Sequence, residues 1–154
     1  QVAGAPEEQL EPVGTLAHIT SLSQDQPGLL SIECLGTQRF RVDRHSRLKH
    51  GLWVADVTLL ADDASVALPD DLAAVAESLR QVRANLRARS NGDASFSDEG
   101  ARYDDCAWVS NRWCELLPLP VGTRQRLMSL ENPLLRLELL ADLLAKAGIG
   151  RSDA

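Results

Sequence analysis

Lysine is nearly absent from this sequence, which contains only Lys49 and Lys146. A phosphate-binding P-loop requires a lysine directly after a glycine, because the loop amides and the lysine together hold the phosphates. Leu48 precedes the first lysine and Ala145 precedes the second. Nucleotide hydrolysis by that route is therefore excluded, and a serine–lysine hydrolase pair is disfavoured because neither lysine falls in a segment expected to be buried.

Cysteine and histidine are also few. The three cysteines form no paired spacing, which argues against a disulfide framework and favours a reducing compartment such as the cytoplasm. With the three histidines they give neither a CxxC nor an HxxxH pattern, so we expect no metal and no cofactor. Cys106 and Cys114 lie eight residues apart in a predicted helix, where small core residues are the simpler interpretation.

Long apolar runs and catalytic motifs are missing as well. No apolar run reaches the roughly 20 residues that span a membrane. The first residues, QVAGAPEEQL, lack both the pattern of a signal peptide and an initiator methionine, which suggests a fragment. No GxSxG or HExxH motif occurs. We therefore expect no catalytic residue and no enzyme activity, although 154 residues suffice to bury a core without a metal or disulfide.

Acidic residues prevail, but their distribution is uneven. The formal net charge is −6, so the surface as a whole does not attract nucleic acid. The stretch 39–49, RFRVDRHSRLK, has five basic residues against Asp43 and a net charge of +4. It is either the solvated face of a strand pair or a contact site for an anionic partner such as RNA or an acidic peptide, with Arg44 and Arg47 as candidate contacts. Phe40 is its only aromatic residue, so base stacking has weak support.

The first half of the chain has the short period of β-strands. A strand is predicted at 13–23 and a turn at 24–28, and residues 29–44 are predicted to form a hairpin. A three-residue loop at 35–37 sets Ile32 opposite Phe40, which places the apolar residues on one face.

The same register has two consequences. Arg39 and Arg41 are predicted on the solvated face of the hairpin, with Phe40 on the inner face. The strand that follows, at 52–63, has apolar residues on both faces, which is typical of a strand covered on both sides.

The second half has a helical period. Pro69 opens the first predicted helix, with acidic residues in its first turn, and SNGD at 90–93 ends it. Further helices are predicted from about residue 104 to the PLP at 118–120, at about 122–130, and from the cap Asn132 to Gly148. The tail beyond is predicted to be frayed.

The helical stripes identify candidate core and surface residues. Cys106, Val109, Trp113 and Leu117 share one stripe, which makes Trp113 a core residue. Trp108 cannot face the same way, so it is the better exposed candidate and a possible partner contact.

Three early motifs and one late motif resemble a known family. PVGTLAHI, CLGTQRFRV and LWVADVTLLADD occur in the order and spacing of the N-terminal substrate-recognition domain of Lon-type ATP-dependent proteases. The later ELLPLP and RQRLMSLENPLLRLELLADLL resemble the helical end of that domain. The resemblance covers about residues 12–147.

This resemblance implies an α+β fold, with a small PUA-like β-barrel followed by a helical bundle. We expect a barrel lobe at 1–66 and a helical lobe at 67–154. The family's opening Phe-Pro-rich strand and hairpin have no counterpart here, so the barrel is expected to be incomplete, with an exposed edge. The sequence shows no ATPase or peptidase module after its last predicted helix, so we expect a stand-alone relative of this domain or a fragment of one.

The leading hypothesis is a non-catalytic module that binds apolar polypeptide segments, in a groove where the lobes meet or at an unpaired sheet edge. The alternative is an RNA- or anion-binding module that uses residues 39–49. An enzyme of unfamiliar design is a third possibility, which a deep pocket around a perturbed acid or histidine would favour.

Overall fold

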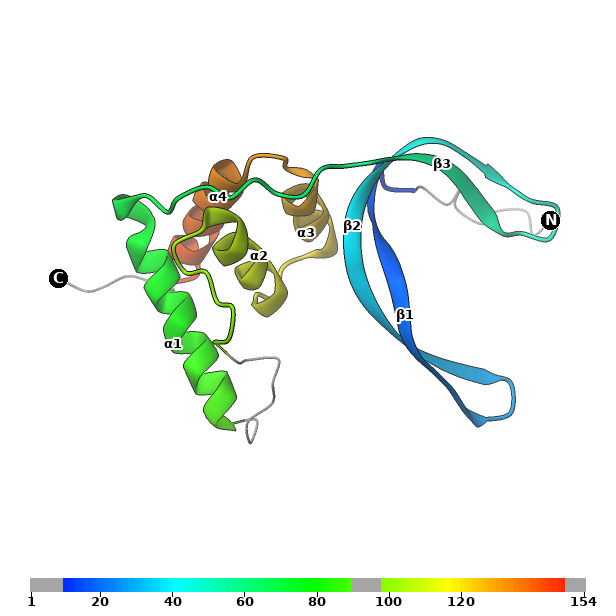
Figure 1. The fold of residues 1–154 in the computed structure, drawn as a ribbon, viewed down its shortest axis with the longest axis horizontal. Helices are drawn as coiled ribbons and strands as arrows, with labels where there is room; N and C mark the ends of the chain where they lie inside the picture. The colour runs from blue at the N-terminus through cyan, green and yellow to red at the C-terminus, as the bar shows by residue number, and fades with distance from the viewer. Residues whose placement is uncertain (1–9, 90–97, 149–154) are drawn as a thin grey trace. The chain divides into compact units, whose positions relative to one another are not determined.

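The computed structural model describes residues 10–89 and 98–148. The chain divides into two compact units, Gln1–Asp62 and Asp63–Ala154. The first is built from strands and the second from helices (Figure 1). This mixed composition agrees with the predicted fold class.

The first unit is an antiparallel sheet of three strands: β1 (Val13–Gln26), β2 (Leu29–Arg47) and β3 (Trp53–Leu59). Their order in the sheet is β1-β2-β3. The first turn lies between β1 and β2, where Gly28 has a φ of 83°, a conformation that glycine adopts without strain. The described strands form an open sheet and not a closed barrel, which agrees with the expectation of an incomplete barrel with an exposed edge, while a PUA-like topology is not established.

The predicted hairpin loop at 35–37 is wrong. β2 continues through these residues, and Gly36 pairs with Ala17 inside the ladder with β1. Ile32 accordingly pairs with Leu22 rather than with Phe40. Glycine at position 36 is explained by close packing and not by a turn, since a Cβ at Gly36 would lie 3.3 Å from the Thr15 methyl group.

The predicted orientation of Phe40 and Arg41 is consistent with the structure. Phe40 is half-buried, and its ring lies over Gly14, the residue it pairs with. Arg41 is exposed and lies 3.8 Å from the Asp43 carboxylate. Arg39, which was expected to be solvated, is half-buried.

Strand β3 is less covered than its sequence indicates. Val54, Val57 and Leu59 are 38%, 39% and 52% exposed, so the prediction of a strand buried on both faces is wrong. Apolar residues on both sides of a strand indicate that both faces can be covered. The three described strands, however, form only a single layer.

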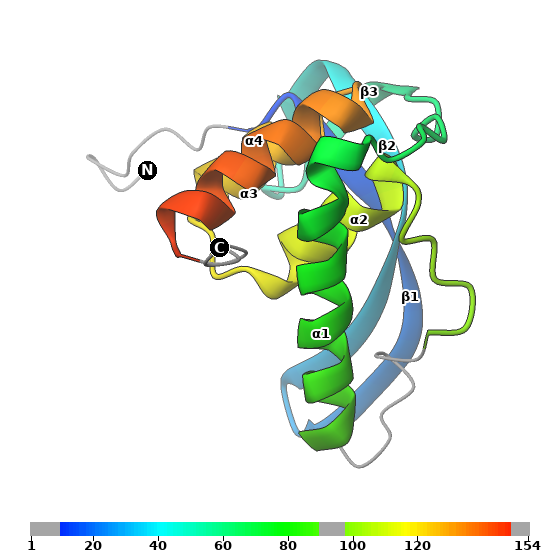
Figure 2. The ribbon, with the colours of Figure 1, turned by 90° about the vertical axis from the view of Figure 1, so that its left-hand side faces the viewer.

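The second unit contains a short 3-10 turn, η1 (Asp70–Leu72), and four helices: α1 (Ala73–Arg89), α2 (Cys106–Leu116), α3 (Val121–Ser129) and α4 (Pro133–Lys146). α2 packs against α4 and α1 (Figure 2). The predicted helix end at 90–93 and the tail at 149–154 lie outside the described residues.

Local signals position these helices. Pro69 precedes η1, with Asp70 in its first turn, and the Asp105 side chain accepts a hydrogen bond from the Ala107 amide at the start of α2. The Asn132 side chain caps α4, with Pro133 in its first turn.

The core of the helical unit follows the predicted stripes. Trp113 is buried, and its indole N–H donates to the Val75 carbonyl oxygen over 3.1 Å. The buried apolar residues that cluster in this core are Leu72, Ala76, Leu79, Cys106, Val109, Trp113, Leu117, Leu127, Leu137, Leu140 and Leu144. Two arginines, Arg83 and Arg136, are buried with them, which the sequence pattern did not indicate.

Candidate functional site

One face of the β1–β2 ladder is apolar and exposed. Ile19 pairs with Cys34 and Leu22 with Ile32, and Leu30 lies on the same face because strand side chains alternate. The four large residues of this set are each 56% to 63% exposed. We call Ile19, Leu22, Leu30, Ile32 and Cys34 the apolar arm face.

The opposite face of the same ladder is mixed. It holds the pairs His18–Leu35, Ser21–Glu33 and Ser23–Ser31. Alternation therefore separates an apolar surface from a mixed one, on which the exposed Leu29 and Leu35 lie among polar side chains.

The arm face needs a partner on physical grounds. Among the described strands, residues 29–35 of β2 pair with β1 alone, because the ladder with β3 begins at Phe40. A two-stranded ribbon is marginal in water unless a third element covers its apolar face. Four large apolar side chains, each more than half exposed, form a patch of the kind that marks interaction sites.

The arm also offers a strand edge. β1 is an outer strand of the sheet, and no other described strand pairs with its outer side. The main-chain groups of such an edge can accept an extended segment, while a neighbouring face contacts alternate side chains of that segment.

The sequence-based hypothesis missed this surface for an identifiable reason. The mistaken hairpin set Ile32 against Phe40 and so placed it inside. The signal that could have found the arm face is the sequence around Pro27–Gly28, since apolar residues at matching distances on both sides of that turn share one face.

Arg44 and Arg47, predicted as partner contacts, both lie near the β2–β3 turn. Arg44 pairs with Asp56 at 3.1 Å, and both side chains are exposed. The guanidinium of Arg47 lies 5.7 Å from the centre of the Trp53 ring, and its Nε donates to the Gly51 carbonyl oxygen over 3.0 Å.

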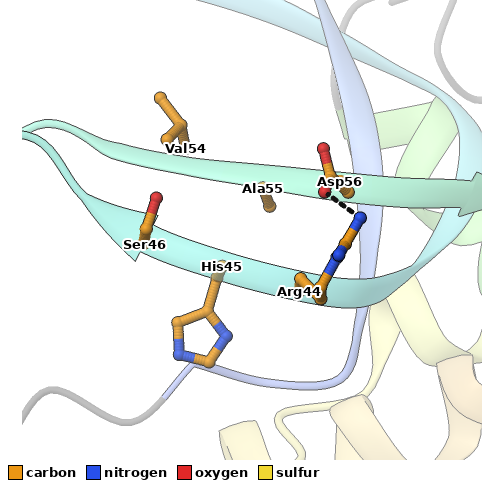
Figure 3. A pocket seen from close by; sticks show the side chains of 6 residues that line it. All are labelled: Arg44, His45, Ser46, Val54, Ala55 and Asp56. Atoms are coloured by element: carbon orange, nitrogen blue, oxygen red, sulfur yellow. Dashed lines mark ion pairs between the residues drawn. The ribbon is translucent and has the colours of Figure 1, made fainter.

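A shallow depression of about 420 Å³ lies beside Arg44. Figure 3 shows its lining from both strands of this hairpin. The six residues are Arg44, His45, Ser46, Val54, Ala55 and Asp56.

Trp108, the third predicted contact, belongs to the helical unit. Its ring meets the edge of Tyr103 with centroids 4.8 Å apart, and the Arg83 guanidinium lies 5.4 Å from its centre. It is half-buried, so only part of the ring remains for a partner.

The described residues give no indication of a reactive centre at the cysteines of the helical unit. Burial is the main cause that raises the pKa of both the Cys106 and the Cys114 thiol, which opposes the thiolate form required of a nucleophile. Over residues 10–89 and 98–148, no three acidic, histidine or cysteine side chains gather into a metal ligand set. None of the described helices combines the length and apolar character that crossing a bilayer requires.

Comparison with known proteins adds an independent observation. A family model described as the ATP-dependent protease La (LON) substrate-binding domain matches residues 1–146. The structure is similar to the Lon N-terminal domain protein of Xanthomonas campestris, with a TM-score of 0.68 and 28% identity over 92% of this chain and 71% of that one.

A second solved structure shows the same fold. The N-terminal domain of a Lon protease from the Mycobacterium avium complex gives a TM-score of 0.60 at 17% identity, covering 92% of this chain and 74% of that one. No curated protein matches the sequence.

Proposed function

The chain belongs to the family of Lon substrate-binding domains, as its motifs predicted, and we propose that it binds exposed apolar segments of polypeptides through the apolar arm face. The arm face is the observation that carries this proposal. It presents four large apolar side chains with no charged residue among them. The module has a binding role without chemistry of its own.

The mode of binding follows from the geometry of the ribbon. An extended segment that lies along the outer side of β1 forms main-chain hydrogen bonds with the strand. Every second side chain of that segment points toward the arm face, because side chains alternate along a strand. Main-chain bonding is independent of sequence, so the module tolerates many segments provided that alternate positions are apolar.

The compartment is part of the same proposal. Cys34 is an exposed free thiol on the arm face. Such thiols persist in reducing compartments, which favours the cytoplasm.

The test uses two double variants with the same geometry on opposite faces. Leu22→Gln with Ile32→Gln changes a directly paired couple on the arm face, and Ser23→Gln with Ser31→Gln changes the next couple on the opposite face. A fluorescent apolar peptide is titrated into each protein, and anisotropy reports binding. We expect the first variant to lose most of the affinity and the second to keep it.

Folding is checked separately by circular dichroism. Glutamine at these exposed positions removes apolar surface without introducing a buried polar group, so both variants should fold. Equal peptide affinity in the two folded variants would exclude the arm face as the binding surface. Failure of the unaltered protein to bind any apolar peptide would exclude the function itself.

A further inference from the structure

The turn between β2 and β3 combines positive charge with exposed apolar groups. Residues 44–54, which we call the cationic tip, include three cations and no acidic residue, in a chain whose net charge is −6. The cations are Arg44, Arg47 and Lys49, and the exposed apolar side chains are Leu48, Leu52 and Val54.

The tip has a defined backbone. The Leu48 amide donates to the Leu52 carbonyl oxygen and the Gly51 amide to that of Leu48, both over 2.8 Å. Gly51 has a φ of 93°, and the Arg47 side chain bonds to its carbonyl oxygen. A surface that is already ordered loses less entropy when it binds.

Arg44 is held weakly in its present contact. Its side chain is 84% exposed and that of Asp56 is 69% exposed, and ion pairs between exposed groups contribute little to stability. A carboxylate of a ligand can therefore replace Asp56 at low cost. In the adjacent depression Val54 lies on the same face as Arg44, Ser46 and Asp56, and it offers an apolar contact beside that carboxylate.

We propose that the cationic tip binds acidic residues that lie roughly ten or more positions from the apolar segment of a polypeptide ligand, because ten positions of the continuous strand β2 separate Cys34 on the arm face from Arg44. The module then prefers an apolar segment that carries aspartate or glutamate at that spacing. This inference rests on the proposed function. The predominantly negative chain repels acidic polypeptides in general, and the local field of the tip directs their carboxylates to one place.

The geometry favours an acidic peptide over a single-stranded nucleic acid. Nucleic-acid binding of that kind depends on aromatic rings on which bases stack. The one tryptophan of the tip, Trp53, is half-buried and already contacts Arg47 and His45, the latter with ring centroids 5.5 Å apart.

The experiment compares labelled peptides that share one apolar core and carry glutamate, glutamine or lysine in a flank about ten residues from that core. At low salt we expect the glutamate-flanked peptide to bind about fivefold more tightly than the glutamine-flanked one, the effect of two exposed ion pairs. The advantage should shrink as salt screens the charges.

Matched charge variants identify the surface. Arg44→Gln with Lys49→Gln should abolish the preference for acidic flanks. Arg126→Gln with Lys146→Gln removes the same charge from exposed positions in the helical unit and should leave the preference intact.

The outcomes separate this inference from the proposed function. Binding of all three peptides with equal affinity overturns the inference and leaves the function standing. No binding of the glutamine-flanked peptide overturns the function. An oligouridine probe that binds as tightly as the acidic peptide, and loses that binding with the Arg44 and Lys49 changes, overturns the inference in favour of RNA.

Discussion

Arg136 and Asp63 form a two-pronged ion pair inside the helical unit, 73 residues apart in sequence. The guanidinium Nη1 and Nη2 lie 2.6 and 3.1 Å from the two carboxylate oxygens. Nη1 also donates to the Asn111 side-chain oxygen, while Nε and Nη2 donate to the carbonyl oxygens of Leu127 and Leu130. One side chain of α4 thus joins α2, the end of α3 and the segment that precedes η1.

Removing the arginine should leave a nearly buried carboxylate without its main partner. We expect Arg136→Met to lower the free energy of unfolding of the helical unit by about 3–5 kcal/mol. Arg126→Met, at an exposed position of α3, should change it by less than about 0.5 kcal/mol. Urea denaturation followed by tryptophan fluorescence measures both, since Trp113 lies in the same core. Equal stability of the two variants would show that the pair is dispensable.

The contrast between the two units shows how far local sequence signals reach. The helical unit was predicted closely because Pro69, Asn132 and Pro133 mark helix starts within one turn of the chain. The buried Arg136 was missed because some of its partners lie far away in sequence. A charged residue between leucines is ordinarily expected to be exposed to solvent.

The sheet was predicted less well because strand pairing is non-local. The extended segments were identified, yet Gly36 was interpreted as a turn that divides β2. Its actual partner in the ladder, Ala17, lies 19 residues away, beyond the reach of a local signal. This one error of register hid the apolar arm face. The family motifs do not depend on register, which explains why the family was identified while its candidate surface was not.

Gly14 and Phe40 provide a test of packing in the sheet unit. A Cβ at Gly14 would lie 2.5 Å from Cζ of the Phe40 ring. Gly14→Ala should therefore displace the ring and destabilise this unit by about 1–3 kcal/mol. Thermal unfolding measures the loss, and the same change in a Phe40→Leu background should cost less because the ring is gone.

Gly122→Ala serves as the control for that experiment. A Cβ at Gly122 meets nothing within 4 Å, and alanine favours a helix over glycine by up to about 1 kcal/mol. We expect this variant to be at least as stable as the unaltered protein. A Gly14→Ala protein that is equally stable would mean that the close ring contact is not a constraint.

Asp98 should give the helical unit a sensitivity to acid. The Tyr103 hydroxyl donates to its carboxylate over 2.8 Å, and the Arg87 guanidinium lies 2.9 Å from it. The Tyr103 hydrogen bond first, and then Arg87, lower the pKa of Asp98, and the positive charge of Arg83 acts in the same direction. A lowered folded-state pKa means that this contribution is present above the ordinary carboxyl pKa and is lost as the pH falls through the folded value.

Tyr103→Phe should raise the pKa of Asp98, which a carbon-detected NMR titration of the carboxyl group measures. Acid unfolding should then begin at a higher pH. In an Asp98→Asn background the tyrosine change should produce no further shift of the acid midpoint. An unchanged titration of Asp98 in the Tyr103→Phe protein would assign the lowered pKa to the arginines alone.

The thiol of Cys34 allows the arm face to be probed without altering it. Cys34 is exposed, while Cys106 is buried and Cys114 is half-buried. Because burial raises the pKa of the latter two thiols, few thiolates form there. Iodoacetamide should therefore alkylate Cys34 first, as mass spectrometry of proteolytic fragments would show.

A bound apolar peptide should slow this alkylation, because it covers the face on which Cys34 lies beside Ile19 and Ile32. The protection should disappear in the Leu22→Gln, Ile32→Gln variant and persist in the Ser23→Gln, Ser31→Gln variant, since only the first removes the apolar contact. A peptide that binds with full affinity yet leaves the alkylation rate of Cys34 unchanged must lie elsewhere on the molecule. That result would show that the peptide binds outside the arm face, even if both double variants weakened the complex.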